Sequence, residues 1–128
     1  MKSYLKTISI GVMSLEDYKK RTIAIAKGEY QLQKDEPKIW FRSMKSLAHV
    51  LSEENQKLLK LIIEQKPKSI SELEPLTGRK ANNLLRTLRT MEQYGLVHLE
   101  KGGVGERGRS PLIPEVLYDM ANVQIHLH

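Results

Sequence analysis

The chain has 128 residues, of which 40% are hydrophobic and 28% charged, an ordinary composition for a protein with one compact core. It contains no cysteine, which excludes disulfides and thiolate metal sites, and no run of about 18 apolar residues that could span a membrane. The net charge of +6 permits an anionic partner, and the lack of a signal-peptide pattern leads us to expect a cytoplasmic protein.

Residues 1–38 are predicted to form a strand, a helix and a linker. Alternating apolar residues indicate the strand: Ile8, Ile10 and Val12. Ser14 and the acids after it predict the start of the helix, and Gly28 predicts its end. We interpret this segment as an arm for dimerisation or partner docking, with an ordinary packed subdomain as the alternative.

Residues 39–128 are predicted to form a second domain. A short strand at Ile39–Phe41 is followed by a helix over residues 44–51. Ser52 caps the next helix, and Pro67 ends it. A second helix follows, with three residues expected to face the core: Ile70, Leu73 and Leu76. The only tryptophan lies in the short strand, as core or as a subunit contact.

A longer helix is predicted over about residues 80–94, after a turn at Gly78. Its apolar residues fall on one side at the helical period: Ala81, Leu84, Leu88, Met91 and Gly95. Polar residues lie opposite: Arg79, Asn82, Arg86, Thr90 and Gln93, flanked by Asn83 and Arg89. Residues 79–109 hold seven Lys and Arg against three Glu, with no acid between Arg79 and Thr90. Arg suits guanine and Asn or Gln suits adenine, although a solvated basic face is the alternative.

A β-hairpin is predicted after this helix. Residues 96–99 form its first strand, residues 112–116 return it, and the intervening stretch at 101–109 has four glycines in nine residues. The stretch does not match a phosphate-binding loop, because no Gly-Lys-Ser/Thr ending or following helix is present. We expect a tip with Arg107 and Arg109 near phosphates; a tip that touches nothing is the alternative. Alternation at residues 123–127 predicts a terminal strand.

The segment LTGRKANNLLRTLRTMEQYGLVHLEKGG, residues 76–103, resembles the core of winged helix-turn-helix transcriptional regulators of the MarR-like type. More narrowly, residues 39–125 are similar to a family of winged-helix DNA-binding proteins of archaea and bacteria, some of them antitoxin-like. The resemblance implies DNA-facing residues at five positions: Asn82, Asn83, Arg86, Thr87 and Arg89. Two positions depart from the pattern, with Lys80 in place of a Ser or Thr cap and Leu85 in place of a polar residue.

We therefore expect an α+β protein, a winged helix-turn-helix DNA-binding domain over residues 39–128 with an N-terminal strand-helix extension. It would bind double-stranded DNA as a homodimer and act as a repressor, with the helix at 80–94 in the major groove and the wing at 100–110 on the backbone. Base readout is assigned to Asn82, Asn83, Arg86 and Thr90. Backbone contacts are assigned to Arg79, Lys80, Thr87, Arg89, Lys101, Arg107 and Arg109.

The alternative function is a protein–protein interaction module, such as an antitoxin that neutralises a partner toxin. No catalytic set of Ser, His and Asp, and no pair of carboxylates, is evident, so we expect neither an enzyme nor a cofactor. His126 and His128 would share a face of the terminal strand, but no third ligand stands nearby in sequence. We expect solvent-exposed histidines and no metal site.

Overall fold

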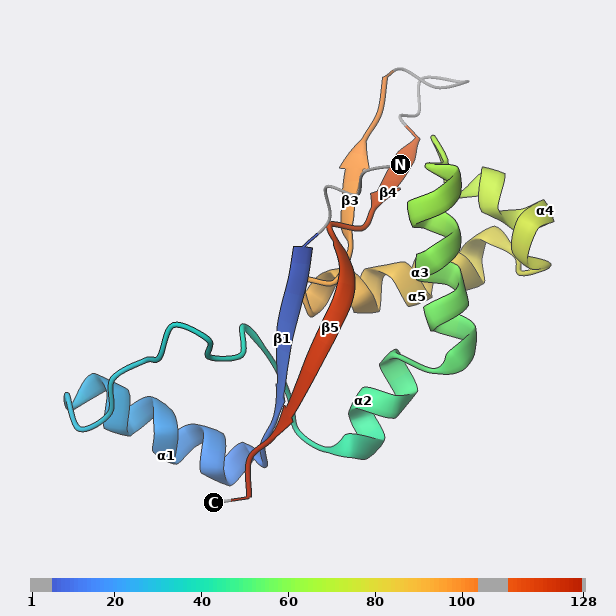
Figure 1. Ribbon diagram of the computed structural model, residues 1–128. Helices are drawn as coiled ribbons and strands as arrows, with labels where there is room; N and C mark the ends of the chain where they lie inside the picture. Colours follow the sequence, from blue (N-terminus) through green and yellow to red (C-terminus); the bar gives the residue numbers. More distant parts are fainter. Residues whose placement is uncertain (1–5, 104–110, 128) are drawn as a thin grey trace. The chain divides into compact units, whose positions relative to one another are not determined.

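The computed structural model describes residues 6–103 and 111–127 and is a mixed α+β structure (Figure 1). It divides into two compact units. The described residues up to His49, with those from Met120 onward, form a sheet unit, and Val50–Asp119 form a helical unit. The boundary expected after residue 38 falls inside the sheet unit, because Ile39–Phe41 pairs with the first strand.

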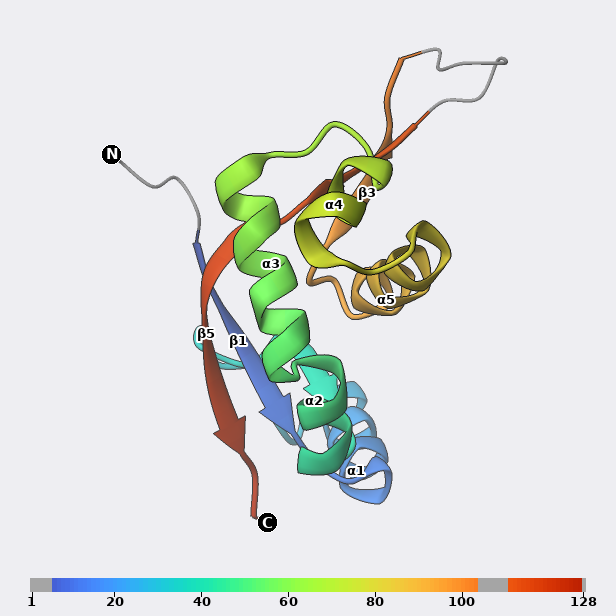
Figure 2. The same ribbon diagram turned by 90° about the vertical axis from the view of Figure 1, so that its right-hand side faces the viewer.

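The sheet unit is built on three strands in the order β2-β1-β5. Their bounds are Lys6–Val12 for β1, Ile39–Phe41 for β2 and Tyr118–Ile125 for β5. Strands β1 and β2 are parallel, with Ile10 opposite Ile39. Figure 2 shows β1 and β5 running in the same direction. The predicted N-terminal strand is confirmed, and it is the centre of a sheet rather than an appended arm.

Helix α1, Leu15–Ala26, connects the parallel strands β1 and β2, which need a crossover of this kind. The predicted cap is confirmed, because the Ser14 hydroxyl accepts a hydrogen bond from the Asp17 N–H at 3.1 Å. No side chain of α1 is fully buried. Its apolar residues are instead half-buried or exposed, as at Ile23, which is 54% exposed.

A tryptophan ring lies against the centre of the sheet. Gly11 pairs with Trp40, and a Cβ atom at Gly11 would lie 2.3 Å from the Trp40 ring. Only glycine therefore leaves room for this ring. The other face of β1 and β2 carries the core of the unit, and its members are buried: Ile8, Ile10, Val12, Ile39 and Phe41.

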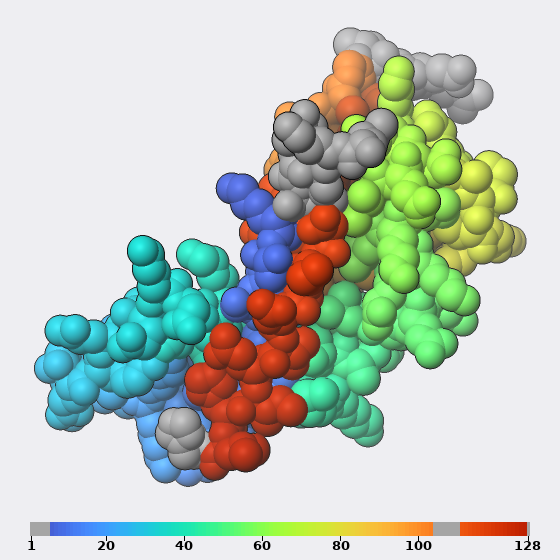
Figure 3. Space-filling view, viewed as in Figure 1, coloured from blue at the N-terminus to red at the C-terminus, as the bar shows by residue number. Residues whose placement is uncertain are grey.

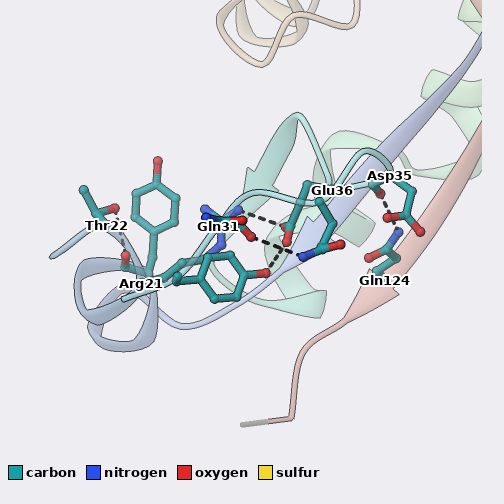
Figure 4. Close-up of polar contacts among 9 residues, drawn as sticks. Arg21, Thr22, Gln31, Asp35, Glu36 and Gln124 are labelled. Atoms are coloured by element: carbon teal, nitrogen blue, oxygen red, sulfur yellow. Dashed lines mark hydrogen bonds and ion pairs between the residues drawn. The ribbon is translucent and has the colours of Figure 1, made fainter. Parts of the chain in front are cut away.

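An arginine of α1 binds a glutamate of the loop that precedes β2 (Figure 4). The Arg21 guanidinium lies 4.8 Å from the Trp40 ring centroid and donates to the Glu36 carboxylate at 2.9 Å. The Tyr30 hydroxyl donates to the other carboxylate oxygen. Burial raises the pKa of Glu36, but the hydrogen bonds from Tyr30 and Arg21 outweigh it and hold that pKa below its ordinary value.

Strand β5 forms one edge of the described sheet, and Figure 3 shows its surface largely open in that view. Its large apolar side chains are exposed: Met120 at 61%, Val123 at 46% and Ile125 at 53%. The predicted terminal strand is thus confirmed, but it contributes little to the core.

The helical unit contains two helices of equal length, α3 at Glu53–Gln65 and α5 at Ala81–Gln93, both close to their predicted bounds. The preceding helix α2, Met44–Val50, is also as predicted. The expected second helix is instead a 3₁₀ turn, η1 at Ser71–Leu73, and a four-residue α4, Glu74–Thr77. The expectation that Leu76 faces the core is wrong, since it is 50% exposed. The 3₁₀ turn has a different period, so regular helical spacing does not hold across it.

A β-hairpin follows α5, with β3 at His98–Lys101 antiparallel to β4 at Leu112–Glu115. The hairpin is confirmed, and α5 contacts both β3 and η1. Buried residues come from every part of this unit: Leu58, Ile62, Leu73, Leu84, Leu88, Met91, Leu96, Val97, Leu99 and Val116. None of the helices in the described ranges is long and apolar enough to cross a membrane.

Candidate nucleic-acid interface

The start of α5 depends on a carboxylate from the preceding helix. Gly78, at a φ of +73°, ends α4 in a left-handed conformation, and the backbone is extended again by Lys80. The Lys80 side chain makes no capping hydrogen bond. The Ala81 N–H donates instead to the Glu74 carboxylate at 2.8 Å. Glu74 therefore supplies both an acceptor and a negative charge at the positive end of α5.

Helix α5 separates an apolar face from a polar face. Leu84, Leu88 and Met91 are fully buried, with no exposed surface. The helix ends at a left-handed Gly95, where the N–H of Leu96 donates to the Met91 carbonyl at 3.0 Å and that of Gly95 to the Glu92 carbonyl. Helix α5 is thus anchored along one side and at both ends, and its polar side faces away from the core.

The Arg79 guanidinium binds three oxygens from two helices. Its Nε donates to Asn83 Oδ1 at 2.8 Å, and one Nη donates to Thr87 Oγ1 at 2.7 Å. The other Nη donates to Oδ1 of Asn55, in the first turn of α3, at 3.2 Å. Three residues assigned to DNA contacts are thus joined to one another, and Arg79 is half-buried among them.

Three further side chains of α5 are exposed: Asn82, Arg86 and Arg89. Asn82 Oδ1 accepts from the N–H of Asn83 at 2.9 Å. The Arg86 side chain makes no hydrogen bond or ion pair with any other described residue, and its carbonyl accepts from the half-buried Thr90 hydroxyl at 3.1 Å. Leu85 is half-buried, between the two faces.

Glu92 connects the end of α5 to the hairpin. One of its oxygens accepts from the N–H of Leu99 at 3.1 Å, and the other lies 3.3 Å from the Arg89 guanidinium. Arg89 is therefore partly neutralised, which the acid-free stretch up to Thr90 did not indicate. Lys101 is exposed at the end of β3, while Arg107 and Arg109 lie outside the described residues.

In a comparison with known protein families, residues 50–122 match a family model described as HVO_A0114. This is more than half of the chain. The chain belongs to the HVO_A0114 family. Comparisons with curated proteins and with solved structures found no match.

The segment matched by the HVO_A0114 model nearly coincides with the helical unit, Val50–Asp119. It contains the whole polar face of α5 and the hairpin, and it omits β1, α1 and β2. Three residues that organise this face were not found from the sequence: Asn55, Glu74 and Glu92. Glu74 and Glu92 each bind a backbone N–H seven residues further along the chain, a spacing without a local sequence signal.

The predicted absence of a metal site stays a prediction. No group of three or more potential metal ligands occurs in the part of the HVO_A0114 family member that the structure describes. The expectation that His126 is solvent-exposed is wrong. The residue is half-buried, and its ring centroid lies 5.0 Å from that of the Trp40 ring. The backbone N–H of His126 donates to the Val12 carbonyl at the end of β1, which holds the residue beside the sheet. His128 lies outside the described residues.

Proposed function

We propose that the protein is a sequence-specific duplex DNA-binding regulator of the winged helix-turn-helix type, similar to MarR-like regulators, and that it represses transcription. In this proposal α4 and α5 are the helix-turn-helix, with α5 as the recognition helix in the major groove. The β3–β4 hairpin is the wing on the DNA backbone. No catalytic role is proposed.

Helix α5 carries the proposal: it buries Leu84, Leu88 and Met91 on one side, and its other side has no acid before Glu92 and presents an Arg86 that is unpaired within the described residues. A helix that only covers a core more often carries Glu and Lys on its solvent side. Arg, Asn and Thr are side chains that bind base edges and phosphates in the major groove. The anchoring of both helix ends supports the same role, because readout requires side chains on a rigid element.

The proposed roles follow the surroundings of each residue. Asn82 and Arg86 are exposed and suited to base edges, and Asn83 and Thr90 flank them. Four positively charged side chains raise the affinity for DNA by attracting its phosphates: Arg79, Lys80, Arg89 and Lys101. Arg107 and Arg109 are assigned to the wing tip from the sequence alone.

We propose that the protein binds as a homodimer, because one recognition helix covers few base pairs. The sequence suggested residues 1–38 for this contact. Strand β1 has no free edge, since β2 and β5 flank it. Strand β5 has a free edge within the described sheet and exposed apolar side chains, and Asp119 is its only charged residue. Two copies that each carry a charge of +6 approach most easily along such a nearly neutral strand.

The test is selection of bound fragments from genomic duplex DNA by the full chain, followed by affinity measurements on the best duplex and on a scrambled one. At one fixed salt concentration, the expected result is a preference of about 10³ or more for the selected duplex. Both affinities should fall with added salt. A folded chain that binds no duplex at low salt would refute the proposal and favour the protein–protein module instead.

A further inference from the structure

We propose that Arg79 sets the specificity of the proposed DNA interface by making Asn83 and Thr87 act as hydrogen-bond donors. This inference rests on the proposed function. Arg79 is then a positioning residue. Asn83 would bind a base edge that carries acceptors, such as guanine O6 and N7, and Thr87 would bind a phosphate oxygen.

The Arg79 guanidinium and the hydrogen bonds that it donates to three side chains form a fork. Three of the five N–H donors of a guanidinium are directed at Asn83, Thr87 and Asn55, at 2.8, 2.7 and 3.2 Å. Asn55 is itself held, because its Nδ2 donates to the Val50 carbonyl at 3.0 Å. Its Oδ1 therefore faces Arg79 from a fixed point on α3. A guanidinium bound on three sides has little freedom to leave for a phosphate.

The fork determines which hydrogen bonds Asn83 and Thr87 can still make. Asn and Thr side chains can each donate and accept hydrogen bonds. Here Asn83 Oδ1 and Thr87 Oγ1 both accept from Arg79. The Asn83 NH₂ group makes no hydrogen bond with a described residue, and the Thr87 hydroxyl group donates none to a described residue. A further donor approaching Asn83 Oδ1 would meet the positive guanidinium, so both side chains are left to donate.

Adenine and guanine differ in the groups that they present to an Asn side chain. Asn reads adenine through two bonds, accepting from N6 and donating to N7. With its oxygen bound to Arg79, Asn83 cannot form this pair without competing with a cation. Guanine presents two acceptors, O6 and N7, at the same positions of the major groove. Asn83 should therefore favour guanine over adenine, contrary to its usual preference.

The experiment compares Arg79→Lys with Lys80→Ala in the full chain, using duplexes that differ by one guanine-to-adenine change. Arg79→Lys keeps the charge but not the fork. We expect it to lose about fivefold or more of the guanine preference at one position while the salt dependence stays unchanged. Lys80→Ala is the matched control at the neighbouring exposed cation. It should keep the preference and lower the log–log salt slope by about one.

Nuclear magnetic resonance tests the fork without DNA and without a variant. In the wild-type chain, the Arg79 Nε–H should exchange with solvent clearly more slowly than the exposed Arg86 Nε–H. Equal exchange of the two would overturn the inference, as would an Arg79→Lys chain that keeps the full guanine preference. A chain that binds no duplex refutes the proposed function, whereas the exchange measurement still decides whether the fork exists.

Discussion

Arg86 lies in the middle of the exposed face of α5, opposite Leu84 and Leu88, which are fully buried. Its side chain is long enough to reach a base and can donate two hydrogen bonds to guanine. We predict that Arg86→Ala binds the selected duplex more weakly by about 1–3 kcal/mol and the scrambled duplex almost unchanged. Affinities at one salt concentration measure this, with the melting temperature as a control of folding. Equal losses on both duplexes would instead identify a phosphate contact.

We expect Glu74 to contribute to stability rather than to binding. Its carboxylate caps α5 at Ala81, where Lys80 provides no capping side chain. We predict that Glu74→Ala lowers the free energy of unfolding by about 0.5–2 kcal/mol, the usual cost of a lost cap. Urea unfolding measures it. Glu64→Ala is the matched control, because Glu64 is exposed and makes no hydrogen bond with a described residue. Similar losses in the two variants would contradict the capping role.

At the scale of elements, the connection between α1 and β2 should respond to acid. The folded pKa of Glu36 lies below its ordinary value of 4.5, although burial opposes this shift. A lowered pKa stabilises the fold above the ordinary value, and the contribution is lost as pH falls through the folded pKa. We predict that Glu36→Gln is less stable than wild type at pH 7 and loses less stability on acidification below about pH 4.5.

Urea unfolding at neutral and acidic pH would measure the two differences. Glu29→Gln is the control, since the Glu29 side chain is exposed and makes no hydrogen bond with a described residue. If Glu36→Gln and Glu29→Gln follow the same pH profile, the carboxylate of Glu36 does not stabilise this connection.

The sequence predicted most elements because their ends carry local signals. Ser14 and Ser52 capped the helices that they were expected to cap, and the alternation in β1 was read correctly. The apolar stripe of α5 was also correct, with Leu84, Leu88 and Met91 buried. These features depend on neighbours a few residues apart, which a linear pattern contains.

The features that could not be predicted from the sequence depend on contacts between distant segments. The pairing of β1 with β2 joins Ile10 to Ile39, and no periodicity indicates which strands become partners. The fork of Arg79 reaches Asn55, 24 residues earlier. The polar face could therefore be identified from its composition, whereas the side chains on it that Arg79 binds could not be separated from those that stay exposed.

At the scale of the whole molecule, the proposed dimer places β5 antiparallel to β5 of a second copy. Val123 lies on this edge strand and is 46% exposed. A lysine there would oppose edge-to-edge pairing through charge and solvation. We predict that the full chain sediments as a dimer and that Val123→Lys sediments as a monomer with a similar melting temperature.

Ile23→Lys is the matched control for this experiment. Ile23 is an apolar residue of α1 with 54% exposure, so the same charge is added to the same unit away from the edge strand. This variant should remain a dimer. A monomeric wild-type chain, or a Val123→Lys chain that still dimerises, would exclude the β5 interface.

The ring that lies over Gly11 gives the protein an intrinsic optical probe. Trp40 is the only tryptophan, and it belongs to the sheet unit, so its fluorescence emission follows the melting of that unit alone. Far-ultraviolet circular dichroism follows the helices of both units. Denaturation curves from the two signals would coincide if the units unfold together and would separate if each unfolds on its own. A spectrometer can thus measure the cooperativity of this chain without any label.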